Sequence, residues 1–183
     1  MDPIKRLKRE LIKHGAVLDI YEDTMELPNG KTEKWDFVSH RMGAACVVAV
    51  RNDGKLILVH QHRPALERFT IELPAGKRDS LEEDTSVCAK RELEEETGYT
   101  CSNLELLLKL NTTVAFCDEF IDVYLATGLT PIDGQHLDEA EDIDVEAFEL
   151  EDLLTRIYQG EIRDSKTVAG ILAYANRCGG NAK

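Results

Sequence analysis

The stretch from Pro74 to Tyr99, PAGKRDSLEEDTSVCAKRELEEETGY, contains the most informative pattern of the chain. Its second half places Glu92, Glu95 and Glu96 at helical spacing, so their side chains share one face of a predicted helix. Like charges at that spacing repel and destabilise an isolated helix. A hard divalent cation would offset the repulsion, because Mg²⁺ and Mn²⁺ prefer oxygen ligands. The run therefore predicts a metal site.

The first half of the stretch supports the same interpretation. An apolar strand ends at Leu73, and the backbone after it can turn the carbonyl of Ala75 toward the metal, where a side chain at Gly76 would obstruct. Asp84 or Thr85 is then expected to cap the helix. The alternative is a solvated acidic helix, which most charge runs turn out to be. The ordered combination of glycines, glutamates and arginine argues against that alternative.

This combination resembles the Nudix box. The matching residues are Gly76, Glu83, Arg91, Glu92, Leu93, Glu95, Glu96, Gly98 and Tyr99. The interval between the first glycine and the first glutamate is one residue longer than in the usual box, so either Glu82 or Glu83 can take that glutamate's part. The Arg-Glu and Glu-Glu elements match without gaps.

The resemblance implies an α/β fold, a Nudix-fold α/β/α sandwich with a mixed β-sheet. It implies a metal site made by Ala75, Glu92, Glu95 and Glu96, with the three glutamates also catalytic, and Mg²⁺ as cofactor with Mn²⁺ as a possible substitute. The expected reaction is hydrolysis of a nucleoside diphosphate derivative, with ADP-ribose giving AMP and ribose 5-phosphate. A GDP-sugar, a dinucleoside polyphosphate or NADH are alternative substrates, and a non-catalytic nucleotide sensor is the alternative outside enzymes.

The N-terminal region is expected to form an extra element. Residues 4–14 place apolar side chains at helical spacing before Gly15, which predicts a short amphipathic helix. Residues 16–25 and 35–38 flank a strong turn signal and predict a hairpin. We therefore expect residues 1–42 to form a helix and hairpin and residues 43–178 to form the Nudix hydrolase domain. A hairpin alone is marginally stable, and the resemblance implies a homodimer, so residues 1–42 are the expected dimerisation element.

Further elements follow from apolar runs and turn signals. Strands are expected at residues 44–50, 56–59, 104–110, 120–126 and 145–150, and helices at 151–158 and 165–176.

Four residues outside the box are candidate substrate contacts. Arg63 is the first choice for a phosphate contact, because a guanidinium presents a fixed fork to phosphate oxygens, although a surface salt bridge is the simpler explanation. Glu72 resembles the glutamate that precedes the box in ADP-ribose pyrophosphatases, and Glu119 resembles a ribose contact of that branch. Trp35 either packs the hairpin or stacks on a purine base. Arg41 and Arg68 are weaker candidates.

The acidic segment 133–144 carries the expected general base. It is either a solvated loop or the mobile loop that supplies a base in related enzymes. The resemblance assigns the base to Glu141, with Glu139 as the second choice. A box glutamate or a metal-bound hydroxide is the remaining alternative.

Composition limits the partners. The 183 residues include 22 Lys and Arg against 35 Asp and Glu, a formal net charge of -13, so nucleic acid would meet a repulsive field. Five scattered cysteines without a CxxC pair indicate reduced thiols and a cytoplasmic location. No segment has the length of a membrane span. The expected partner is a small nucleoside diphosphate.

Overall fold

The computed structural model describes residues 3–137 and 142–180. The chain divides into two compact units: residues 1–43 with 111–120, and residues 44–110 with 121–183. We call them the N-terminal unit and the main unit. Within the described residues, no helix is long and apolar enough to cross a membrane.

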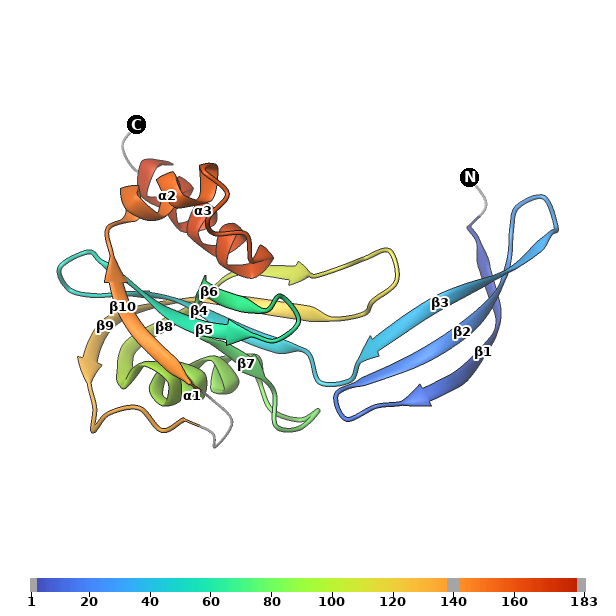
Figure 1. The fold of residues 1–183 in the computed structure, drawn as a ribbon, viewed down its shortest axis with the longest axis horizontal. Helices are drawn as coiled ribbons and strands as arrows, with labels where there is room; N and C mark the ends of the chain where they lie inside the picture. The colour runs from blue at the N-terminus through green and yellow to red at the C-terminus, as the bar shows by residue number, and fades with distance from the viewer. Residues whose placement is uncertain (1–2, 138–141, 181–183) are drawn as a thin grey trace. The chain divides into compact units, whose positions relative to one another are not determined.

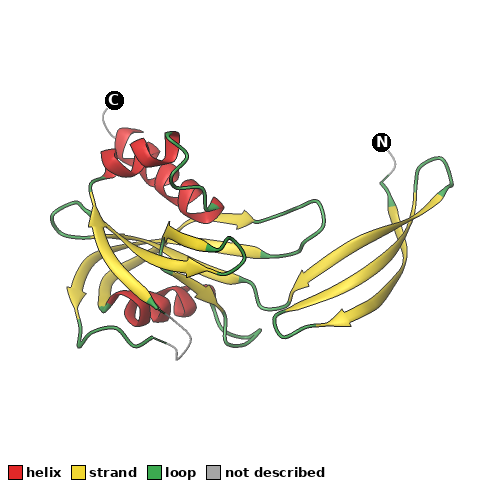
Figure 2. Ribbon diagram, in the orientation of Figure 1, coloured by secondary structure: helices red, strands yellow, loops and turns green. Residues whose placement is uncertain are grey.

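The N-terminal unit is a three-stranded antiparallel sheet (Figure 2). Its strands, in spatial order, are β1 (Lys5–His14), β2 (Leu18–Glu26) and β3 (Thr32–His40). The segment 111–120 joins this unit through β3, where the Val38 N–H donates to the carbonyl of Phe116 at 2.7 Å. The predicted hairpin is thus present as β2 and β3.

The predicted helix over residues 4–14 is wrong, because this segment forms β1. Two register shifts in the β1–β2 pairing interrupt the simple alternation by which a strand is identified from sequence. Arg9 of β1 donates two hydrogen bonds to Asp23 of β2, at 2.7 and 2.6 Å, and Asp23 is buried. A helix of this length is marginal in water, so the backbone ladder and this ion pair favour the strand.

The main unit is built on a mixed seven-stranded sheet. Five strands follow the order β10-β5-β4-β9-β8, with β6 paired to β5 and β7 to β4. The pair β4–β9 is parallel, whereas the pairs β10–β5, β4–β5, β4–β7 and β5–β6 are antiparallel. The bounds are β4 (Ala44–Val50), β5 (Leu56–Arg63), β6 (Arg68–Glu72), β7 (Ala75–Lys77), β8 (Tyr99–Asn111), β9 (Phe120–Pro131) and β10 (Ile143–Phe148).

Helices cover both faces of this sheet (Figure 1). They are α1 (Thr85–Thr97) on one face, and α2 (Leu150–Tyr158) and α3 (Ser165–Gly180) on the other. Alternate residues of β4 explain the two layers: Val47 packs in the core under α1, whereas Val48 packs in the core under α2 and α3. This is the predicted α/β/α sandwich.

Candidate active site

The helix α1 begins and ends where its sequence requires. Asp84 is the N-cap, and its side chain accepts a hydrogen bond from the Ser86 N–H at 2.8 Å. Gly98 ends the helix in the left-handed conformation, with φ of 70°, which glycine adopts without strain. Leu93 and Ala89 are fully buried against the sheet, so the orientation of the helix about its axis is fixed.

The carboxylates of Glu92 and Glu96 lie on the side of α1 that faces β7. The Ala75 N–H donates to Oε2 of Glu96 at 2.9 Å. A Cβ atom added to Gly76 would overlap the Glu92 carboxylate, so this close approach requires glycine. Both glutamates are buried, with 8% of Glu92 and 3% of Glu96 exposed. Tertiary contacts thus bring Ala75, Glu92 and Glu96 together.

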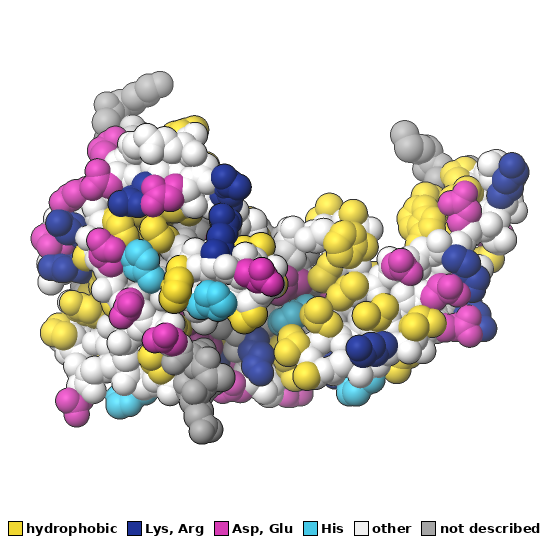
Figure 3. Space-filling view, in the orientation of Figure 1, with side chains coloured by type: hydrophobic (Ala, Val, Ile, Leu, Met, Phe, Trp, Pro, Cys, Tyr) yellow, Lys and Arg dark blue, Asp and Glu magenta, His cyan; other side chains and the backbone are white. Residues whose placement is uncertain are grey.

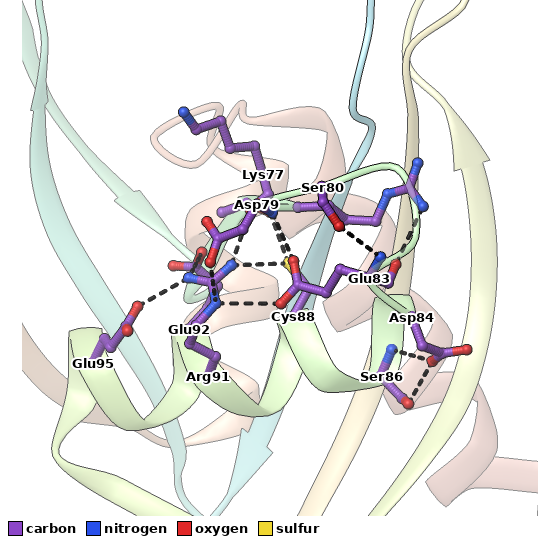
Figure 4. Close-up of polar contacts among 12 residues, drawn as sticks. Lys77, Asp79, Ser80, Glu83, Asp84, Ser86, Cys88, Arg91, Glu92 and Glu95 are labelled. Carbon is purple, nitrogen blue, oxygen red and sulfur yellow. Dashed lines mark hydrogen bonds and ion pairs between the residues drawn. The ribbon is translucent and has the colours of Figure 1, made fainter.

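Arg91 connects two of the predicted metal ligands (Figure 4). Its Nη1 donates to Glu92 at 2.7 Å and to Glu95 at 3.0 Å, and its Nη2 donates to the carbonyl of Lys77 at 3.0 Å. Burial lowers the pKa of the guanidinium, but the charge of Glu92 and hydrogen bonds to the surrounding carboxylates raise it overall. A permanently charged arginine therefore offsets part of the repulsion among the glutamates.

Of the two candidates for the first box glutamate, Glu83 joins this cluster. Its carboxylate accepts from the Asp79 N–H at 2.7 Å and lies 3.4 Å from Nε of Arg91. Glu82 is exposed. Both glutamates lie in the loop before α1, which begins at Thr85.

The donor atoms at this place are of the type that a hard divalent cation binds. Among the described residues, however, no group of three or more Asp, Glu, His or Cys side chains is placed so that it could hold a metal ion. Arg91 and the Ala75 N–H instead engage the carboxylates directly. Even so, the carboxylates of Glu92 and Glu96 are buried beside Gly76, where a larger residue would overlap Glu92. Carboxylate oxygens are the ligands that Mg²⁺ prefers.

Arg63 and Glu72 form an ion pair with each other. Arg63 forms a fork with Glu72, with hydrogen bonds of 2.8 and 2.6 Å. Lys166 at the start of α3 donates to the same carboxylate at 2.5 Å. Burial alone would raise the pKa of Glu72, but the hydrogen bond from Arg63 and the charge and hydrogen bond of Lys166 lower it to about 2. Glu72 is therefore ionised at neutral pH.

A cavity of about 680 Å³ adjoins this pair, within the size range of ligand pockets. Apolar residues such as Phe69 and Ile162 line it together with five cationic side chains, Arg63, Arg68, Arg156, Arg163 and Lys166, and three carboxylates, Glu72, Glu161 and Asp164. Lys and Arg side chains form a row beside the start of α3 in Figure 3. The cavity is cationic in a chain whose net charge is -13, which suits an anionic ligand.

The remaining candidates belong to the N-terminal unit or fall outside the described residues. Trp35 is 40% exposed in the N-terminal unit, and its Nε1 donates to Glu33 at 3.3 Å. Glu119 belongs to the same unit and accepts from the Thr112 hydroxyl at 2.8 Å. Glu141 and Glu139 lie outside the described residues. Lys166, which contacts Glu72, is a site residue that the sequence patterns did not indicate.

The family of this chain follows from its similarity to known proteins. The model of the NUDIX domain matches residues 40–169. The chain belongs to the Nudix family. Relatives over most of its length include ADP-ribose pyrophosphatases, and this protein is a Nudix pyrophosphohydrolase. Nudix hydrolases generally require a divalent metal ion, which agrees with the donor set described above.

Two curated relatives of this Nudix chain are equally similar to it. A methanol dehydrogenase activator from Bacillus methanolicus and an ADP-ribose pyrophosphatase from Bacillus subtilis are each 42% identical over 168 residues. Each match covers 91% of this chain and 90% of the relative.

A solved structure described as an ADP compounds hydrolase has the same fold, with a TM-score of 0.88 at 19% identity. The match covers 99% of this chain and 97% of that one. It confirms the predicted Nudix fold.

Proposed function

We propose that this enzyme hydrolyses ADP-ribose to AMP and ribose 5-phosphate with Mg²⁺, for which Mn²⁺ can substitute. The observation that carries the proposal is the convergence of Glu92, Glu96 and Ala75 around Gly76, with Arg91 joining Glu95 to the group. The choice of ADP-ribose is supported by the B. subtilis relative, whose name specifies that substrate.

The proposed metal ligands are the carboxylates of Glu92, Glu95 and Glu96 and the carbonyl of Ala75. A divalent ion held there would neutralise the diphosphate and stabilise charge that develops on the phosphoryl oxygens. Arg91 holds Glu92 and Glu95 in place. The Ala75 N–H fixes one oxygen of Glu96 and so orients the carboxylate.

The reaction adds one water molecule across the bridging P–O bond. The water oxygen bonds to one phosphorus as the bond between that phosphorus and the bridging oxygen breaks, and the bridging oxygen leaves with the other phosphate. A base must accept a proton from the attacking water. We assign this role to Glu141, with Glu139 as the second choice, on the resemblance of the acidic segment to the family.

The substrate-binding part of the proposal uses the cationic cavity. Arg63 is held by Glu72, yet 39% of its side chain is exposed, so the guanidinium can reach a phosphate oxygen without leaving its partner. Glu72 thereby positions Arg63. Trp35 would stack on the adenine, and Glu119 would contact a ribose hydroxyl.

We also propose that the enzyme is a homodimer and that residues 1–42 are its dimerisation element. The N-terminal unit exposes apolar side chains, which are visible in Figure 3. They include Ile4, Leu7, Leu11, Ile12, Val17, Leu18 and Ile20. Exposed apolar groups that lie close together commonly mark interfaces. Light scattering should therefore give twice the mass of the chain, and a monomer at micromolar concentration contradicts the assignment.

A substrate panel tests the catalytic proposal. ADP-ribose, a GDP-sugar, a dinucleoside polyphosphate and NADH are each incubated with the enzyme, and the products are separated by chromatography. We expect ADP-ribose to have the highest kcat/KM, with AMP as product. A chelator should abolish the reaction, and Mg²⁺ or Mn²⁺ should restore it. A higher kcat/KM for another diphosphate would replace ADP-ribose, and binding of ADP-ribose without turnover in either metal would indicate a sensor.

A further inference from the structure

Lys166 lies at the start of α3 and is almost completely buried, with 7% of the residue exposed. Its Nζ donates to Glu72 at 2.5 Å and to Asp164 at 2.9 Å. Burying an ammonium group is costly unless carboxylates surround it. Burial alone would lower the pKa of Lys166, but the charges of Glu72 and Asp164 raise it. Lys166 is thus a charged link between α3 and the end of β6.

Thr167 makes a second link one residue further along the chain. It is fully buried, and its Oγ1 accepts a hydrogen bond from the Leu73 N–H at 2.9 Å. The same hydroxyl donates to Asp164 at 2.7 Å, so both hydrogen-bonding roles of the oxygen are used. The start of α3 therefore holds two consecutive residues, Glu72 and Leu73, through two adjacent side chains.

The segment that these links hold leads directly to the metal site. Ala75 follows Leu73 after a single proline, whose ring fixes its own φ and restricts the preceding residue. The carbonyl of Pro74 accepts from the Val47 N–H at 2.9 Å, and the Ala75 N–H donates to Glu96 at 2.9 Å. A shift of Glu72 and Leu73 would be transmitted through this short, stiff connection to Ala75.

We propose that Lys166 and Thr167 are positioning residues for the metal site. They fix the backbone at Glu72 and Leu73, which places the Ala75 carbonyl and, through the Ala75 N–H, the Glu96 carboxylate. Residues that hold metal ligands without touching the metal commonly change metal affinity or activity about 10- to 100-fold when they are replaced. The inference rests on the metal role of Ala75 and Glu96 proposed above.

The test replaces each link and measures metal binding directly. Thr167→Val removes the hydroxyl with little change of volume, Thr167→Ser keeps it, and Lys166→Met removes the charge. Arg177→Gln is the matched control, since Arg177 lies on the same helix in an exposed ion pair with Glu105. Binding of Mn²⁺ without substrate is followed from the electron paramagnetic resonance signal of the free ion. Values of kcat and KM are then measured at varied Mg²⁺ with a diphosphate that the wild type cleaves.

We expect Thr167→Val and Lys166→Met to raise the dissociation constant for Mn²⁺ by at least about 10-fold. Thr167, unlike Lys166, does not line the cationic cavity, so Thr167→Val should keep KM at saturating metal within about twofold of wild type. Thr167→Ser and Arg177→Gln should bind Mn²⁺ as the wild type does. Should Lys166→Met fail to fold, the pair of Thr167 variants decides the matter.

Two results would overturn the inference. Unchanged Mn²⁺ affinity in folded Thr167→Val shows that the links support only the fold, and a raised KM with unchanged metal affinity shows that they contact substrate. If the wild type itself binds no Mn²⁺ and cleaves no diphosphate, the proposed function fails, and the positioning role fails with it.

Discussion

Glu96→Gln should lower kcat by at least about 100-fold, equivalent to roughly 2.7 kcal/mol of transition-state stabilisation. The amide oxygen of glutamine can still accept the hydrogen bond from the Ala75 N–H, so the buried contact survives. What is lost is the negative charge, which a metal ligand in this position must supply. The measurement is kcat at saturating Mg²⁺, together with the midpoint of thermal unfolding.

Glu94→Gln is the matched control for that variant. Glu94 lies on the same helix, but its carboxylate accepts from the Thr100 hydroxyl at 2.6 Å and is not part of the box. We expect its kcat to stay within about twofold of the wild type, because an exchange away from the reacting atoms removes no transition-state contact. A near-normal rate for Glu96→Gln at saturating Mg²⁺ would refute the metal assignment.

Gly76→Ala should lower kcat by about 100-fold, the order of loss expected when a catalytic group is displaced by about 1 Å. The new Cβ would overlap the Glu92 carboxylate, which is the end of a flexible side chain and can move aside. The fold is therefore retained while the carboxylate leaves its position between Arg91 and β7. Kinetics with Mg²⁺ and thermal unfolding, measured on the same preparation, separate the two effects.

Gly179→Ala serves as the control for the added methyl group, because a Cβ at Gly179 meets no atom within 4 Å. Its kcat and unfolding midpoint should match those of the wild type. If Gly76→Ala keeps full activity, the close approach of Glu92 to β7 has no part in catalysis. If Gly76→Ala unfolds, neither the Glu92 side chain nor the backbone after Leu73 can move far enough to admit the added methyl group.

Local features were predictable wherever the deciding contacts lie within a few residues. The capping of α1 by Asp84 and its termination at Gly98 depend on neighbouring backbone groups, so the sequence contains the necessary information. The first strand was not predictable in this way. Helical spacing over residues 4–14 was overridden by pairing with β2 and by the ion pair between Arg9 and Asp23, which are 14 residues apart.

The sequence by itself determined the family and the helix face that carries Glu92, Glu95 and Glu96, because side chains three and four residues apart on a helix must be neighbours. Only the tertiary structure decided what those side chains meet. Arg63 turned out to be paired with Glu72, and Lys166 reaches the same carboxylate from 94 residues away. Contacts between residues so far apart in the sequence depend on how the sheet and its covering helices are connected. Local sequence periodicity does not predict that connection.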